Sequence, residues 1–117
     1  MMHITLHLIV PLVVALAFYR ARWRRAALIM IATMLVDVDH LLADPIYDPE
    51  RCSIGFHPLH TLPAIGVYGL LLLLPVLFGR DRQLTRGRGV LRPGARFVHW
   101  VALGLLIHMA LDGIDCL

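Results

Sequence analysis

The chain has 117 residues, of which 59% are hydrophobic and 16% are charged, and its mean hydropathy is +0.75. A soluble domain contains about 25% charged and about 45–50% apolar residues, so this composition predicts an outer surface that meets lipid. The length provides one domain and excludes a multidomain enzyme, so we expect a single transmembrane domain over residues 1–117.

Four stretches are apolar enough to be membrane spans, each close to the roughly 20 residues that cross a bilayer. They cover about residues 4–19, 26–43, 59–79 and 97–114. Arginines follow the first stretch instead of preceding it, so we expect a retained span and not a cleaved signal peptide. The sequence therefore predicts an all-α fold, specifically an integral membrane four-helix bundle.

Ten of the eleven basic residues, all of them arginine, lie in two of the three links between these stretches. They are Arg20, Arg22, Arg24, Arg25, Arg80, Arg82, Arg86, Arg88, Arg92 and Arg96. The positive-inside rule places both links in the cytoplasm. The N-terminus, the C-terminus and the loop 44–58 are then expected on the outer side of the cytoplasmic membrane. This topology accounts for the basic residues, so we expect the lipid bilayer as a partner and no nucleic acid.

The chain has two cysteines, and this topology places both on the outer side. Cys52 lies in the predicted outer loop, and Cys116 lies at the outer end of the fourth span. A disulfide persists in such a compartment, so a Cys52–Cys116 bridge is one interpretation. Two free or metal-bound thiols are the alternatives.

Six of the seven histidines and seven of the eight acidic residues fall on the predicted outer side, at similar depth in all four spans. Residues three or four apart share one face of a helix. The pairs His3/His7, Asp37/His40 and His108/Asp112 follow this spacing. The sequence therefore predicts one polar cluster at the outer ends of the helices.

An ionisable residue inside a span costs about 2.5–3.5 kcal/mol or more, so these side chains require partners. Converging histidines and carboxylates are typical ligands of a divalent metal, zinc above all, with manganese or iron as alternatives and one or two ions bound. The predicted ligands are His7, Asp37, His60, His108 and Asp112, and further candidates are His3 and Asp115. A general base or ligand-orienting role is predicted for Asp39, His40 and His57. A hydrogen-bonded polar core without metal is the alternative.

Three short motifs together carry a resemblance to known families. They are Asp37-Val38-Asp39-His40, His57-Pro58-Leu59-His60-Thr61 and His108-Met109-Ala110-Leu111-Asp112. The chain resembles a family of small uncharacterised bacterial multi-pass membrane proteins, and it is more distantly similar to the inner-membrane metal-dependent hydrolase family. The resemblance implies metal binding at Asp37, Asp39, His40, His60, His108 and Asp112. The chain departs from the distant family at Pro58, where that family usually has arginine.

Two classes of function fit this sequence. The first is a metal-dependent hydrolase that uses metal-activated water on a lipid or lipid-linked substrate at the outer membrane face. The second is a divalent-metal binding or transport module, or a structural metal site that stabilises a small bundle. Such a bundle could be a homodimer, with Gly66, Gly69 and Gly104 as close-packing positions.

Overall fold

The computed structural model describes residues 2–46, 48, 50–81 and 90–117, and within these ranges it contains four α-helices. The α-helices are α1 (Met2–Phe18), α2 (Trp23–Ala32), α3 (Leu62–Phe78) and α4 (Pro93–Asp115). Three 3-10 helices accompany them: η1 (Arg20–Arg22), η2 (Thr33–Leu42) and η3 (Pro58–His60). Two-residue strands β1 (Arg80–Asp81) and β2 (Val90–Leu91) pair antiparallel. The predicted helical fold with four helices is thus confirmed.

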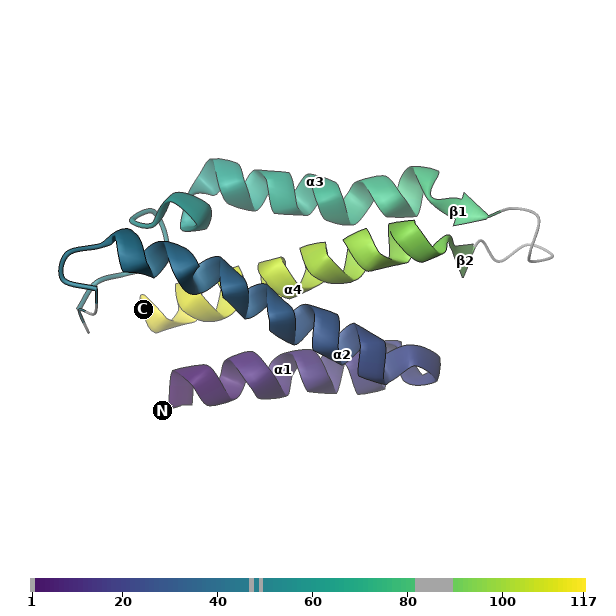
Figure 1. The fold of residues 1–117 in the computed structure, drawn as a ribbon, viewed down its shortest axis with the longest axis horizontal. Coiled ribbons are helices and arrows are strands. Elements are labelled where there is room, and N and C mark those ends of the chain that lie inside the picture. The colour runs from purple at the N-terminus through teal and green to yellow at the C-terminus, as the bar shows by residue number, and fades with distance from the viewer. Residues whose placement is uncertain (1, 47, 49, 82–89) are drawn as a thin grey trace.

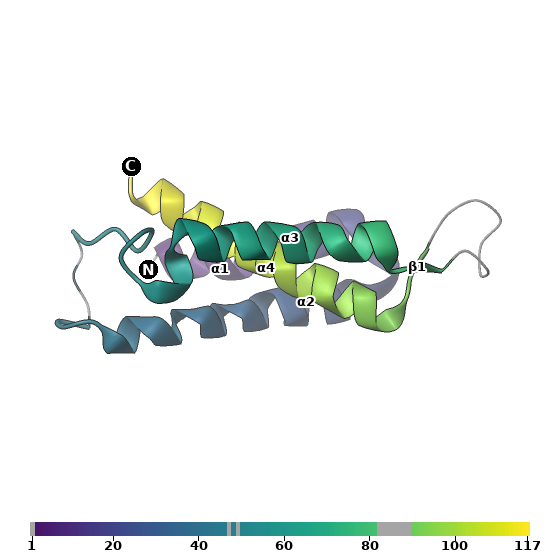
Figure 2. The same ribbon diagram turned by 90° about the horizontal axis from the view of Figure 1, so that it is seen from above.

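The helices run along one long axis, and the molecule measures 54 × 27 × 22 Å (Figure 1). Both termini and the segment that follows η2 lie at one end, and the α1–α2 turn and the β1–β2 pair lie at the other (Figures 1 and 2). We call the first the His/Asp end, formed by the start of α1, the described residues among 37–60 (37–46, 48 and 50–60) and the last turns of α4. We call the second the arginine end, formed by residues 19–25, 79–81 and 90–96.

The predicted span 26–43 corresponds to two kinds of helix. Residues Arg20–Leu42 form one helical segment, but its turns tighten from α to 3-10 after Ala32. A 3-10 helix has three residues per turn, so Thr33, Val36 and Asp39 fall on one stripe, and all three are buried. Asp37 and His40 lie beside this stripe, and Asp37 faces His108 of α4.

The starts and ends of the last two helices follow their prolines and a glycine. Pro63 and Pro93 lie in the first turns of α3 and α4, where a missing backbone N–H is tolerated. Gly79 ends α3, and a Cβ there would lie 2.4 Å from the Ala95 Cβ. The link between α3 and α4 is shorter than the predicted 80–96, because α4 already begins at Pro93. Its residues Arg82, Arg86 and Arg88 lie outside the described residues.

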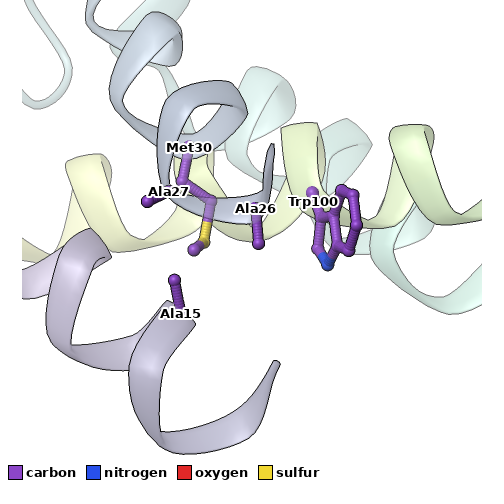
Figure 3. Packing of buried hydrophobic residues seen from close by; sticks show 5 residues of the cluster. All are labelled: Ala15, Ala26, Ala27, Met30 and Trp100. Carbon is purple, nitrogen blue, oxygen red and sulfur yellow. The ribbon is translucent and has the colours of Figure 1, made fainter. Parts of the chain in front are cut away.

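Small side chains join α1, α2 and α4 in the half of the bundle nearer the arginine end (Figure 3). The buried cluster there consists of Ala15, Ala26, Ala27, Met30 and Trp100. Alanine on both α1 and α2 allows the two helices to approach closely. Figure 3 shows Met30 extending from α2 toward Ala15 on α1.

A second close approach joins α4 to the end of α2 and the start of η2. A Cβ on Gly104 of α4 would lie 2.8 Å from the Met30 Cα and 2.8 Å from the Thr33 Oγ1. Gly104 therefore fixes the separation between α4 and the segment that leads into η2. His108 follows Gly104 by four residues, and Asp37 follows Thr33 by four, so this contact sets the distance between those two side chains.

Large apolar side chains remain exposed on the outside of the bundle, including Leu28 at 68%, Leu35 at 78% and Leu77 at 67%. Among the described residues, α4 is the one helix long and apolar enough by itself to cross a membrane. The segments His3–Phe18 and Arg20–Leu42 pass the same test only as a pair bent by 119°, and α3 is shorter. One candidate span is thus established by length and composition.

Candidate metal centre

Four side chains from three helical segments converge at the His/Asp end. Asp37 comes from η2, His60 from η3, and His108 and Asp112 from successive turns of α4. The His60 Nε2 lies 3.4 Å from the Asp37 Oδ1 and 3.1 Å from the Asp112 Oδ2. The His108 Nε2 lies 2.9 Å from the same Asp37 oxygen and 3.5 Å from the same Asp112 oxygen.

These four separations match those between the ligands of one metal ion. Donor atoms about 2.1 Å from a tetrahedral ion lie about 3.4 Å from one another. The four side chains provide two imidazole nitrogens and two carboxylate oxygens, and His60, His108 and Asp112 are buried. Zinc accepts this donor set and this coordination number.

The donor atoms are poorly satisfied by hydrogen bonds. The His108 Nε2 donates to the Asp37 Oδ1, but the His60 Nε2 and both Asp112 oxygens have no hydrogen-bond partner among the described residues. A buried polar atom without a partner costs about 1–3 kcal/mol, so several at one place require an explanation. A cation between them would satisfy all of them.

Asp39 holds the His60 ring from its other side. The His60 Nδ1 donates to the Asp39 Oδ2 over 3.2 Å, and the Leu59 backbone N–H donates to the same oxygen over 2.9 Å. Asp39 is 4% exposed. With its proton on Nδ1, the His60 ring directs the lone pair of Nε2 toward Asp37 and Asp112. A carboxylate in this position commonly orients a metal-binding histidine.

A second group of donors, on α1, reaches Asp112 from the opposite side. The His7 Nε2 lies 3.1 Å from the Asp112 Oδ1, and the His3 Nε2 lies 3.5 Å from that oxygen. The His7 Nδ1 donates to the His3 carbonyl oxygen over 2.8 Å. The His3 Nδ1 contacts the Asp115 carboxylate. His3, His7 and Asp112 therefore form a second set of potential ligands.

A third group contains Asp39, His40 and His57. The His40 Nδ1 donates to the Asp39 Oδ1 over 3.2 Å, and the Ser53 hydroxyl donates to the His40 Nε2 over 3.1 Å. The His57 ring lies against the His40 ring, with 3.7 Å between their centroids. Burial lowers the pKa of the His57 imidazole, and the neighbouring His40 lowers it further.

Comparison with known proteins places the chain in a family. A family model described as a family of unknown function, DUF6122, matches residues 1–82. The chain belongs to the DUF6122 family. No curated protein and no solved structure matches the chain. The DUF6122 match includes α1, η2, η3 and α3, and it therefore contains His7, Asp37 and His60, while His108 and Asp112 follow it on α4.

This DUF6122 chain has a cavity of about 610 Å³ beside the three groups. Its lining includes Asp37, His57 and Asp112, together with Arg51 from the loop before η3. Cys52 and Cys116 form a disulfide, with their Cα atoms 5.1 Å apart, and both line the same cavity. The disulfide therefore ties the loop that forms one wall of the cavity to the end of α4.

The structure places all ten predicted site residues at the His/Asp end: nine lie in the three groups described above, and Asp115 contacts His3 of the second group. The ten are His3, His7, Asp37, Asp39, His40, His57, His60, His108, Asp112 and Asp115. Sequence patterns did not indicate Ser53, because a loop residue follows no helical spacing. They indicated Gly104 only as a close-packing position. Gly66 and Gly69, the other two such positions, have open space where a Cβ would be.

Proposed function

We propose that this protein is an integral membrane protein that binds a divalent metal, preferably zinc, through Asp37, His60, His108 and Asp112. We further propose that it is a metal-dependent hydrolase of a lipid or lipid-linked substrate at the outer face of the cytoplasmic membrane. One observation carries the metal site: four donor atoms lie 2.9–3.5 Å apart, and the His60 and Asp112 atoms among them lack hydrogen-bond partners within the described structure.

The proposal of several membrane spans rests on where the apolar and charged residues lie. Exposed leucine, isoleucine, valine and phenylalanine side chains occur on all four helices, and contiguous apolar surface of this kind is a membrane or partner contact. Charged residues concentrate at the two ends of the 54 Å axis. At 17 residues, α1 and α3 reach the lower limit of about 17 residues for a span.

The orientation follows from the arginine end and the disulfide together. Arg20, Arg22, Arg24 and Arg25 lie at one end of the bundle, which the positive-inside rule assigns to the cytoplasm. The His/Asp end, with both termini, then faces the outside. The Cys52–Cys116 disulfide belongs to that end, and disulfides persist in oxidising compartments outside the cytoplasm.

The cavity gives the metal site access to a substrate. A bound zinc ion would supply a Lewis acid, and with a fifth coordination position beside its four protein ligands it would lower the pKa of a water ligand to about 7. His57 lines the same cavity, and its imidazole is the general base that we propose for such a water. Arg51 also lines the cavity, where its guanidinium donates to the Pro45 carbonyl oxygen and lies 3.8 Å from the Asp48 carboxylate. A phosphate ester is the substrate group that we propose for it, in exchange for the contact with Asp48.

A transport function has less support. Beyond the site, toward the arginine end, the described core consists of Ala15, Ala26, Ala27, Met30 and Trp100. These side chains offer a cation no ligands comparable to the donors of Asp37 and His60. A binding site that opens to one side only therefore agrees better with this packing.

Metal content and lipid turnover test the proposal in two steps. The full chain is purified in detergent, and elemental analysis should find zinc in the wild type and much less in Asp37→Asn and His60→Ala. Asp44→Asn, the same change at an exposed residue, should keep the metal. Vesicles of phosphatidylethanolamine and phosphatidylglycerol are then incubated with the protein, and mass spectrometry records the products.

Each result decides one part of the proposal. Hydrolysis that stops on chelation and returns with zinc supports the enzyme. Full turnover by Asp37→Asn would exclude catalysis at this site. Loss of folding on chelation without any lipid product would show a structural metal ion instead.

A further inference from the structure

Asp112 directs its two carboxylate oxygens to different sets of histidines. Its Oδ1 lies 3.1 Å from the His7 Nε2 and 3.5 Å from the His3 Nε2. Its Oδ2 lies 3.1 Å from the His60 Nε2 and 3.5 Å from the His108 Nε2. Four imidazoles from three segments thus converge with the same ring nitrogen on one buried carboxylate, two on each oxygen.

We propose that the site holds two divalent ions bridged by the Asp112 carboxylate. This inference rests on the proposed metal site and adds a second ion to it. The inner ion has the ligands Asp37, His60, His108 and the Asp112 Oδ2. The outer ion has the ligands His3, His7 and the Asp112 Oδ1. A carboxylate that bridges two ions about 3.5–4 Å apart is a common arrangement in hydrolytic sites.

The outer ion is supported by hydrogen bonds at the other nitrogen of each ring. The His7 Nδ1 donates to the His3 carbonyl oxygen, and the His3 Nδ1 contacts Asp115. Both rings therefore carry their proton on Nδ1 and direct the Nε2 lone pair at the Asp112 Oδ1. This is the relation that Asp39 has to His60 in the inner group.

Two lone pairs that face each other over 3.1 Å repel unless a cation lies between them. A proton on the His7 Nε2 would be one such cation and would form an ion pair with the Asp112 Oδ1, but the pair lacks the geometry of a hydrogen bond. The His7 side chain is 1% exposed and the Asp112 side chain 2%, so water does not compensate for this. A metal ion beside both atoms accounts for the distance and for the lack of a hydrogen bond.

The two ions would differ in their exposure. The inner group contains His60 and His108, which are 0% and 2% exposed, and meets the cavity through Asp37, whose side chain is 33% exposed. The outer group includes His3, whose side chain is 43% exposed and lines the large cavity. The outer ion has three protein ligands, so it keeps an open position toward the cavity and should bind more weakly than the inner ion.

Metal titration of single variants tests this arrangement. The full chain in detergent is stripped of metal and titrated with Zn²⁺, and elemental analysis after gel filtration gives ions per chain. We expect two ions in the wild type with Kd values at least tenfold apart. His7→Ala and the half-exposed His3→Ala should each bind one ion at the tighter value. His99→Ala, at the arginine end, should bind two.

Mn²⁺ serves as a second probe, because two Mn²⁺ ions about 3.5–4 Å apart are magnetically coupled. The wild type loaded with two Mn²⁺ should lack the electron paramagnetic resonance signal of isolated Mn²⁺. His3→Ala loaded with one ion should show that signal. Asp112→Asn should show no coupled pair at any loading.

The outcomes separate this inference from the proposed single site. One ion in the wild type, retained at unchanged affinity by His7→Ala and His3→Ala, would overturn the bridge and leave the single site. Two ions without coupling would overturn it as well. No ion in the wild type would overturn both proposals. Folded His7→Ala and His3→Ala chains that both bind no ion would exclude two separable ions.

Discussion

The two ends of this bundle bury different chemistry along the same helices. In the half nearer the arginine end, α1, α2 and α4 meet through alanines and Met30, and apolar contacts complete the packing. At the His/Asp end, the buried side chains are those of His7, His60, His108 and Asp112, several of whose atoms have no hydrogen-bond partner among the described residues. The half nearer the arginine end also leaves two buried nitrogens, the Trp100 Nε1 and the His99 Nδ1, without a hydrogen-bond partner among the described residues. The His/Asp end leaves five such atoms close together, so it is the end that calls for a ligand from outside the chain.

Removal of the metal should have the largest effect, and it should divide the molecule at this boundary. A ligand at a thousandfold excess over its Kd stabilises a fold by about 4 kcal/mol, and chelation removes that contribution. Hydrogen exchange measured by mass spectrometry should increase in η2 and the last turns of α4. Exchange in α2 should stay unchanged. A uniform increase along the chain would show that the two ends do not differ in this way.

Gly104→Ala should have the next largest effect, because Gly104 lies where the two halves meet. The added Cβ would lie 2.8 Å from the Met30 Cα, so α2 and α4 must separate. Overpacking of this kind costs about 1–3 kcal/mol, and it would move Asp37 away from His108. We expect a Kd for Zn²⁺ about 10- to 100-fold higher, measured by competition with a chelating dye.

The chain contains a matched control for this substitution. Gly66 lies in α3, and no atom lies within 4 Å of the position that its Cβ would take. Gly66→Ala should leave the Zn²⁺ affinity unchanged. Equal effects of the two substitutions would contradict the role of Gly104 in setting the distance between η2 and α4.

The tightening of η2 shows what the sequence could not provide. The α and 3-10 helices differ by about 20° per residue, which amounts to about 200° over ten residues. The pattern of apolar and acidic residues from Thr33 to Leu42 is compatible with either type of helix. Packing against Gly104 and α3 selects the tighter turn, and this selection depends on atoms that are distant in sequence. Helical spacing alone therefore predicted that Asp37 and His40 lie on one face, but it did not predict which neighbouring element that face meets.

The gathering of polar side chains at one end could be predicted, because short links force successive helices to run back and forth. The histidines and aspartates at similar depth in four apolar stretches must then meet at the same end. The sequence could not predict that one Asp112 oxygen faces His7 and the other faces His60, since this depends on how each helix is rotated about its axis. For the same reason the sequence left open whether Asp39 binds metal or orients His60.

Asp39→Asn should have a smaller effect than Gly104→Ala, because it changes a hydrogen bond to one ligand and moves no helix. The Asp39 Oδ2 accepts from both His60 and the Leu59 backbone. Loss of such a partner commonly weakens metal binding by about 10-fold or somewhat more. The Zn²⁺ Kd should rise accordingly, while Asp44→Asn should leave it unchanged. A complete loss of zinc would show instead that Asp39 binds the metal directly.

Tyr19→Phe should have the smallest effect, and it tests the comparison from the arginine end. The Tyr19 hydroxyl and the His99 Nε2 form a hydrogen bond of 2.9 Å between the end of α1 and α4. Its loss should cost about 1 kcal/mol of unfolding free energy, measured by thermal unfolding in detergent. The zinc content and the Kd should remain those of the wild type, because the apolar packing between Tyr19 and the metal site stays complete. A lower zinc content would show that the two ends are coupled through α1, and the His/Asp end would then depend on more than its own ligands.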